Sequence, residues 1–443
     1  MSARTPSFPA PPRVDLDPGR VPGWADRLRV LAYGLAVVFI FTVPWEAAVH
    51  LAAIGRLSKA LGLFAGLVWL ISAIGRGRLR RPDALHTTFF VMLVWSGLTF
   101  FWSLDPLQSI GGFVTYTQVF MLLLMIWDLF DRLPAIVTGL QAYVLGAYIS
   151  SGSIIVNFLT RTPTRFPGHQ RFAALGFEVD GIALIVALAA PAAWFLAAGP
   201  PGWRRSRIWT LVNYAYVPTA LFALVLTGTR GAVLASLPTL AFVFGSIRRA
   251  HGARRAISFG SVVVAILLVT AFAPPEMLGR IGSAWDELTG HSDPAGRYGS
   301  GEIGGRGATW LESLEALASR PVIGVGLDAH RAAIATGKEA HNIYVSVLTE
   351  TGIVGFLLFA GVLASIWARI RRLSGWRRRY WFAQLAVLAI GGMSLSLEDS
   401  KSVWIFAALA VSSAALEDWV RPSGPGEDAT PANRTRAAGS PAG

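Results

Sequence analysis

The chain has 443 residues, of which 53% are hydrophobic and only 15% are charged, and its mean hydropathy is +0.51. A soluble protein carries about 25% charged residues, so this composition argues against a soluble enzyme or binding module. The net charge of +13 would suggest nucleic acid as partner of a soluble protein, but in a membrane protein the position of each charge decides its meaning. The absence of cysteine excludes disulfides, iron–sulfur clusters, thiolate zinc sites and cysteine nucleophiles.

Apolar stretches long enough to cross a bilayer follow one another along the chain. The first six lie at 28–48, 57–75, 86–103, 112–130, 134–159 and 173–199. The others lie at 208–226, 229–247, 257–274, 342–370, 380–397 and 401–417. Because a bilayer core is spanned by roughly 20 apolar residues in a helix, we expect an all-α, polytopic integral membrane protein with about 12 transmembrane helices.

These stretches also predict the domain organisation. Transmembrane helices 1–9 occupy 28–274, one large loop containing short helices occupies 275–341, and transmembrane helices 10–12 occupy 342–417. The tails 1–27 and 418–443 are rich in Pro, Ala, Gly and Arg, and we expect both to be disordered.

Arginines gather in every second turn between the predicted helices. They lie at 76–81, 132, 204–207, 248–255 and 369–379, and near both ends of the chain at 4–29 and 421–436. Together these segments hold 26 of the 39 basic residues. The positive-inside rule makes this face cytoplasmic, so both termini are predicted to be cytoplasmic and the loop 275–341 to lie on the other side.

A few arginines lie on the external face, where the rule does not predict them. The loop 160–172 contains Arg161, Arg165 and Arg171, and Arg230 lies in the short turn Thr227-Gly228-Thr229-Arg230-Gly231. Arginine binds phosphate oxygens bidentately and stays charged when partly dehydrated, so we expect these side chains to bind the diphosphate head group of a lipid. The alternatives are a solvated loop that contacts anionic lipid and, for Arg230, a residue that snorkels to the membrane surface.

The large loop contains one predicted helix, from Ala308 to Ala318. Trp310, Leu311, Leu314 and Leu317 form one apolar face, which could roof the membrane domain, and Pro321 ends the helix. Arg306 lies just before this helix, either as an anchor for a lid or as a further ligand for the same anion.

His341 is the best single candidate for chemistry. It begins His341-Asn342-Ile343-Tyr344, where the large loop enters the tenth span. Near neutral pH an imidazole can accept a proton from a hydroxyl, which an arginine cannot. We expect His341 to be catalytic and Asn342 to contact substrate; the alternative is a histidine that caps the helix or faces lipid.

Glu178 and Asp180, at the external start of the sixth span, resemble an acidic metal-binding signature. A match of this length is weak, and an acidic residue this close to the membrane requires a partner, for which Arg171 or another external arginine would serve. The sequence therefore predicts no metal site and no cofactor.

Several motifs resemble those of the O-antigen ligase and polymerase superfamily. The first is the Thr-Arg-Gly of residues 229–231; the others are Arg306 followed by Trp310, Pro321 followed by Gly324-Val325-Gly326, His341-Asn342, and Glu350-Thr351-Gly352-Ile353-Val354-Gly355. Their order and spacing match the superfamily over residues 227–355. Two positions depart from it: members often carry a histidine where this chain has Glu339, and an early asparagine of the sixth span is matched by Asp180 or by nothing.

The resemblance implies a metal-independent glycosyltransferase on the periplasmic face of a bacterial inner membrane, in lipopolysaccharide biosynthesis. The donor would be a glycan on undecaprenyl diphosphate and the acceptor a sugar hydroxyl of lipid A–core, with membrane lipid but no nucleic acid as a further partner. Arginines would stabilise the departing diphosphate, and a histidine would deprotonate the acceptor. A polymerase of the same superfamily is an alternative. A lipid or polysaccharide transporter is another, although transporters usually place their binding groups near the membrane midplane.

Overall fold

The computed structural model describes residues 23–51, 55–166, 169–199, 206–275, 278–279 and 302–418. At 165, 166, 169, 170, 302–306, 417 and 418 it describes the backbone without the side-chain environment. The predicted tails 1–27 and 418–443 lie almost entirely outside these residues, as does most of the first half of the predicted loop 275–341.

Each predicted span corresponds to a helix. Along the chain the helices are α1 (Trp24–Thr42) with the 3-10 helix η1 (Val43–Ala48), α2 (Leu57–Arg76), α3 (Ala84–Leu98) with η2 (Thr99–Trp102), α4 (Pro106–Leu129), α5 (Leu133–Leu159), α6 (Val179–Ala197), α7 (Arg207–Thr227), α8 (Arg230–Ile247), α9 (Gly252–Phe272), α13 (Ile343–Ile370), α14 (Gly375–Gly392) and α15 (Lys401–Asp418). In the described part of the chain, ten helices are long and apolar enough to cross a membrane. The other two predicted spans are not among these ten, because the first turn of α14 carries arginines and the apolar stretch of α15 is shorter. The prediction of an all-α polytopic membrane protein is confirmed.

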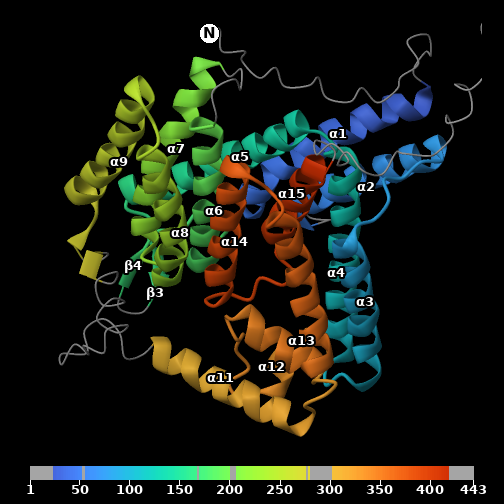
Figure 1. Cartoon of the computed structure of the whole chain (residues 1–443). Coiled ribbons are helices and arrows are strands. Elements are labelled where there is room, and N and C mark those ends of the chain that lie inside the picture. Colours follow the sequence, from blue (N-terminus) through green and yellow to red (C-terminus); the bar gives the residue numbers. More distant parts are fainter. Residues whose placement is uncertain are drawn as a thin grey trace, which may run out of the picture.

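The remaining elements lie between these helices. The large loop forms α11 (Glu302–Ser319) and α12 (His330–Ala333), which lie across the end of the bundle at which α13 begins (Figure 1). Two short antiparallel hairpins pair β1 (His50–Leu51) with β2 (Gly55–Arg56), and β3 (Thr164–Phe166) with β4 (His169–Arg171).

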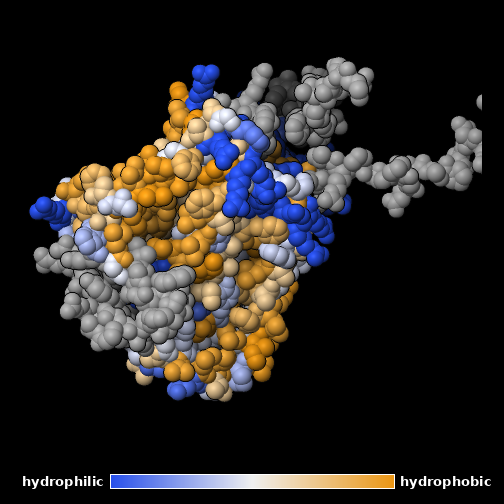
Figure 2. Space-filling view, turned by 60° about the vertical axis from the view of Figure 1, so that its left-hand side comes forward, coloured by the Kyte–Doolittle hydropathy of each residue, from blue (hydrophilic) through white to orange (hydrophobic). Residues whose placement is uncertain are grey.

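Helix α6 forms the centre of the molecule and packs against α5, α7, α8 and α14. Its apolar span is buried on nearly all sides, and the fully buried Trp194 donates its indole N–H to Ser246 Oγ on α8 at 2.7 Å. The outer helices instead expose apolar side chains, which form a broad hydrophobic surface with hydrophilic residues collected at its upper end in Figure 2. Lipid solvates such a surface, so it requires no protein partner.

Helix α6 begins later than the sequence predicts. The expected span 173–199 is helical only from Val179, because the preceding residues are held as a loop. The amide of Phe172 donates to the carbonyl of Leu226 at the end of α7, at 3.2 Å. The carbonyl of Ala173, which a helix beginning there would use in its first turn, instead accepts from the side-chain amide of Asn157 at 2.8 Å.

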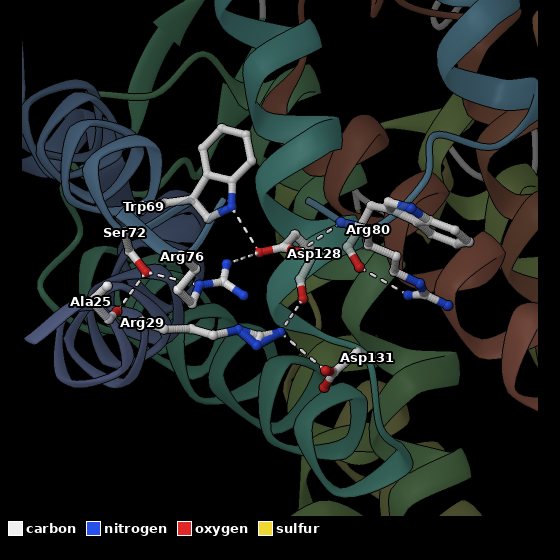
Figure 3. A network of polar contacts seen from close by, with 9 residues as sticks. Ala25, Arg29, Trp69, Ser72, Arg76, Arg80, Asp128 and Asp131 are labelled. Atoms are coloured by element: carbon white, nitrogen blue, oxygen red, sulfur yellow. Dashed lines mark hydrogen bonds and ion pairs between the residues drawn. The ribbon is translucent and has the colours of Figure 1, made fainter. Parts of the chain in front are cut away.

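The arginine-rich end of the bundle is joined by a buried carboxylate. Asp128 of α4 accepts from Arg76 at 3.1 Å, from the indole N–H of Trp69 at 3.1 Å and from the amide of Arg80 at 3.2 Å (Figure 3). Arg29 of α1 pairs with Asp131 at 3.0 Å. These contacts connect α1, α2 and α4, so part of the basic charge at this end also stabilises the fold.

Helix α13 is broken at Gly352, whose φ of +67° and ψ of −172° are not helical. The segment 320–327 occupies the break. Its amides at Val325 and Gly326 donate to the carbonyls of Thr349 and Glu350 at 3.0 and 2.9 Å, and the amide of Ile353 donates back to the carbonyl of Pro321 at 3.0 Å. The backbone groups that the break frees are therefore paired, as burial requires.

Two glycines permit this close approach. A Cβ added at Gly324 would lie 2.4 Å from the carbonyl oxygen of Glu350, and one added at Gly352 would lie 2.3 Å from the carbonyl oxygen of Val322. Both glycines also have positive φ, which disfavours any side chain. The glycines of the Gly-x-Gly and Glu-x-Gly motifs thus serve one backbone contact.

The same segment is bonded to η2 and α4, and the broken helix beside it is bonded to α3. The indole N–H groups of Trp95 and Trp102 donate to the carbonyls of Thr351 and Ile323, at 3.0 and 3.2 Å. The hydroxyl of Ser109 donates to the carbonyl of Leu327 at 2.6 Å. Segment 320–327 is therefore fixed between the broken helix and the α3–α4 pair.

We expect Gly352→Ala to destabilise the protein by about 2–3 kcal/mol, because the new Cβ would overlap a carbonyl oxygen at a backbone conformation unfavourable to alanine. The thermal unfolding midpoint of the purified protein in detergent measures this. Gly361→Ala is the matched control on the same helix, since a Cβ there meets nothing within 4 Å. The control should be neutral or slightly stabilising, and equal midpoints for the two variants would contradict the packing described here.

Candidate functional site

The turn between α7 and α8 has the form that the sequence predicts. Gly228 ends α7 with a left-handed φ of +60°, Thr229 precedes α8, and Arg230 is the first residue of α8. A Cβ added at Gly231 would lie 2.3 Å from Ser394 Oγ, so the start of α8 presses against the segment that follows α14. The Thr-Arg-Gly motif is thus a turn whose final glycine allows this contact.

Arg171 holds this turn from the neighbouring hairpin. Its side chain is 4% exposed; its Nε donates to the carbonyl of Thr227 at 2.8 Å, and its terminal nitrogen donates to Thr229 Oγ1 at 2.7 Å. The same guanidinium forms an ion pair with Asp180, whose carboxylate also accepts from the hydroxyl of Thr229 at 3.0 Å. The expectation that Arg171 could serve as the partner of Asp180 is confirmed, and the ion pair balances the charge of Asp180.

The other predicted arginines are placed as follows. Arg230 is partly exposed at the N-terminus of α8, where the helix dipole favours an anion. Arg161 is exposed, with a left-handed φ of 54°, just after α5. Arg165 lies in β3, and Arg306 lies in α11, which begins at Glu302 and not at Ala308 as predicted. The side chains of both arginines lie outside the described residues.

Helix α11 departs from the sequence prediction in its orientation. Leu311 and Leu314, expected to face the membrane domain, are 64% and 47% exposed. The helix instead packs on α13 through the buried Thr309 and Ser313, and the hydroxyl of Ser313 lies 2.7 Å from Nε2 of His330. Small polar side chains with internal hydrogen bonds allow close helix contact, which explains why this face is inward.

His341 and Asn342 lie where the large loop enters α13, as predicted. His341 has a left-handed φ of 48°, an uncommon conformation for a residue with a side chain, and its imidazole is 35% exposed. Its Nδ1 lies 3.9 Å from Glu339 Oε2. Asn342 is the N-cap of α13: its Oδ1 accepts from the amides of Tyr344 and Val345 at 3.0 and 3.3 Å. The cap fixes the start of the helix and leaves the adjacent imidazole accessible.

The end of α14 connects the two halves of the site. A Cβ added at Gly392 would lie 2.8 Å from Ile343 at the start of α13, and Ser394 lies against Gly231 of α8. The helix starts that carry Arg230 and His341 therefore flank the same short segment, residues 392–394. The structure brings these two predicted groups to one end of the bundle, on either side of α14.

The sequence prediction missed an acidic cavity of about 410 Å³ beside His341. The cavity lies between α4, the segment after Gly326, the first turns of α13 and the loop before α15. Its acidic lining residues are Asp105, Asp328, Glu339, Glu350, Glu398 and Asp399. A signal was present in the sequence, because Glu350 lies inside an apolar span, where a carboxyl group requires a special environment.

Two of these carboxyl groups share one hydroxyl. Ser346 Oγ lies 2.6 Å from Glu398 Oε1 and 3.2 Å from Glu350 Oε1, and the amide of Asp328 donates to Glu350 Oε2 at 3.0 Å. Burial raises the pKa of Asp328 to about 6 and also raises the pKa of Glu398. The cavity thus holds carboxyl groups whose charged forms are poorly solvated by the protein.

Comparison with protein families gives one match. The family model described as O-antigen ligase (Wzy_C) matches residues 215–360, which include the α7–α8 turn, α11, segment 320–327 and the start of α13. No curated protein matches the chain. The matched residues include both Arg230 and His341, and they contain the glycine motifs that hold segment 320–327 in the break of α13. Residues 215–360 of this polytopic membrane protein therefore match the O-antigen ligase family, whose members are membrane enzymes of the glycosyltransferase kind.

Proposed function

We propose that this protein is an O-antigen ligase, which transfers a glycan from undecaprenyl diphosphate to a sugar hydroxyl of lipid A–core on the periplasmic face of a bacterial inner membrane. The observation that carries the proposal is the placement of Arg230 and His341 at two helix starts that flank the end of α14, within the residues that match the family. Arg230 suits an anionic leaving group, and His341 suits proton transfer.

On the donor side, Arg230 binds the diphosphate together with the positive end of the α8 dipole. The exposed Arg161 is a second candidate for this contact, and Arg306 a third. Arg171 acts differently in this proposal: because its guanidinium is bonded to Asp180, Thr229 and the carbonyl of Thr227, it holds the turn that aims Arg230. Arginine charges can stabilise the departing diphosphate in a partly dry site without a divalent cation.

On the acceptor side, His341 takes the proton of the attacking hydroxyl. The hydroxyl oxygen forms a bond to the anomeric carbon, the bond from that carbon to the phosphate oxygen breaks, and undecaprenyl diphosphate leaves with the electron pair. The left-handed backbone at His341 and the Asn342 cap hold the imidazole at a fixed position, which favours catalysis because little reorganisation is required.

Transfer by the purified protein from an undecaprenyl-diphosphate glycan to lipid A–core, in the presence of EDTA, tests this function. A lipopolysaccharide product without added metal supports the proposal. A ladder of longer lipid-linked glycans would instead indicate a polymerase, and no transfer with either acceptor would refute a glycosyltransferase of this kind.

The proposed orientation can be tested by cysteine labelling, since the chain has no cysteine of its own. Lys338→Cys, on the exposed segment before His341, should react with a membrane-impermeant maleimide from the periplasmic side. Arg378→Cys, exposed at the start of α14, should react only after the inner membrane is permeabilised. The reverse pattern would place the site in the cytoplasm.

We expect Arg230→Ala to slow transfer about a hundredfold, which corresponds to about 3 kcal/mol of lost transition-state stabilisation. Arg230→Lys should also be impaired, because an ammonium group cannot form the bidentate contact of a guanidinium. Arg249→Lys is the matched control, since Arg249 is exposed in the turn just beyond the far end of the same helix. If both Arg230 variants transfer at the rate of the control, Arg230 does not bind the diphosphate.

His341→Ala should slow transfer while leaving the affinity for the lipid-linked donor nearly unchanged, because the imidazole acts on the acceptor. Substitution with Gln retains hydrogen bonding but no useful basicity, so His341→Gln should behave like the Ala variant. Donor binding is measured separately by equilibrium binding of the lipid-linked glycan. Normal transfer by His341→Gln would show that the histidine positions the acceptor and does not take its proton.

A further inference from the structure

The acidic cavity lies directly beside the proposed catalytic histidine, and its lining is rich in carboxyl groups, whereas the other side of the site carries arginines. Glu339 and Ala340, which precede His341, both line it. Among the described lining residues, Arg331 and His330 are the basic side chains beside six acidic ones, and Arg331 forms an ion pair with Glu339. Because Arg331 is already paired, the described lining offers little positive charge to a phosphate group, whereas the turn at Arg230 attracts one.

One lining carboxyl group has a polar atom without a hydrogen-bond partner in the described structure, Glu398 Oε2, which is shielded from solvent. The neighbouring His330 is 4% exposed and is held by hydrogen bonds to Ser313 and to the backbone of Lys338, so this part of the cavity wall is fixed within the protein. Buried polar atoms are rarely left unsatisfied in a folded protein, so the free oxygen of Glu398 suits a ligand that carries hydrogen-bonding groups.

The cavity also has the size and the chemistry for a sugar. Its volume of about 410 Å³ lies within the usual range of small-molecule sites, roughly 300–1,000 Å³. Carboxylates accept hydrogen bonds from hydroxyl groups, and the lining residues Gln108, Thr115 and Ser396 can either donate or accept. A ligand with many hydroxyl groups would satisfy this lining, while an anionic ligand would not.

We propose that this cavity is the acceptor subsite: it binds a sugar of the acceptor through its hydroxyl groups and selects neutral or amine-bearing sugars over phosphorylated ones. This inference rests on the proposed transfer reaction. A sugar held between α4, α13 and the loop before α15 has one edge next to residues 339–340, and so presents a hydroxyl toward His341. The donor diphosphate is kept out of the acceptor position because the described lining of this cavity offers it little positive charge.

Kinetics with lipid A–core as acceptor provide the first test. Asp399 is exposed at the rim, so Asp399→Asn should fold normally, and Glu398→Gln probes the partly buried wall. Each variant should raise the acceptor KM about tenfold, the effect of losing a good polar contact, while the donor KM stays nearly unchanged. Glu315→Gln, an exposed position on α11 outside the cavity, is the control with matched chemistry and should behave like wild type.

Direct binding to the full chain, without donor, provides a test that does not depend on transfer. In saturation-transfer difference NMR we expect signals for methyl glucoside and glucosamine but not for glucose 6-phosphate, and Asp399→Asn should lose them. Sugar binding by a wild-type protein that transfers nothing would refute the proposed function and retain the subsite. Transfer with unchanged acceptor KM and unchanged sugar signals in both variants would overturn the subsite, and equal binding of glucose 6-phosphate would overturn its selectivity.

Discussion

The site depends on the insertion of segment 320–327 into the break of α13 at Gly352. Gly324 and Gly352 bring two backbones so close that any side chain would overlap a carbonyl oxygen. The exchanged hydrogen bonds satisfy the groups that the break frees, and the indoles of Trp95 and Trp102 tie the same backbones to α3 and η2. This one contact fixes the large loop on the helix bundle, and with it the histidine and the cavity at the start of α13.

Charged groups at this end of the protein form two clusters, one around the turn at Arg230 and one in the acidic cavity. Each cluster lowers the free-energy cost of burying its charged groups in a different way. On the arginine side, the buried Arg171 is paired with Asp180, so the turn at Arg230 is held rigid without a net charge from the pair. On the acidic side, carboxyl groups share Ser346 and a backbone amide, and burial raises the pKa of Asp328 to about 6. The end of α14 lies between the two clusters, so the proposed anion site and the proposed sugar site are separated by a short segment of chain.

The opposite end uses charge for assembly. Asp128 gathers basic side chains and an indole from α1 and α2, as Figure 3 shows, and Asp83 pairs with Arg369 of α13 at 2.8 Å. The arginines that indicate orientation by their number therefore also join helices that are distant in the sequence. Because these arginines pair with carboxylates, acidic side chains can be buried among them at the end of the bundle, where an unpaired carboxylate would be costly.

The sequence by itself determined the helical architecture, because the length of each apolar stretch and the prolines and glycines at its ends act locally. It also located the turn of Arg230 and a partner for Asp180, since both belong to short segments with few possible neighbours. Tertiary structure decided the rest. The outward direction of Leu311 and Leu314 depends on the packing of α11 on α13. The acidic cavity is assembled from α4, the large loop, α13 and the loop before α15, so its carboxyl groups meet only when distant segments pack together, and no local pattern specifies that packing.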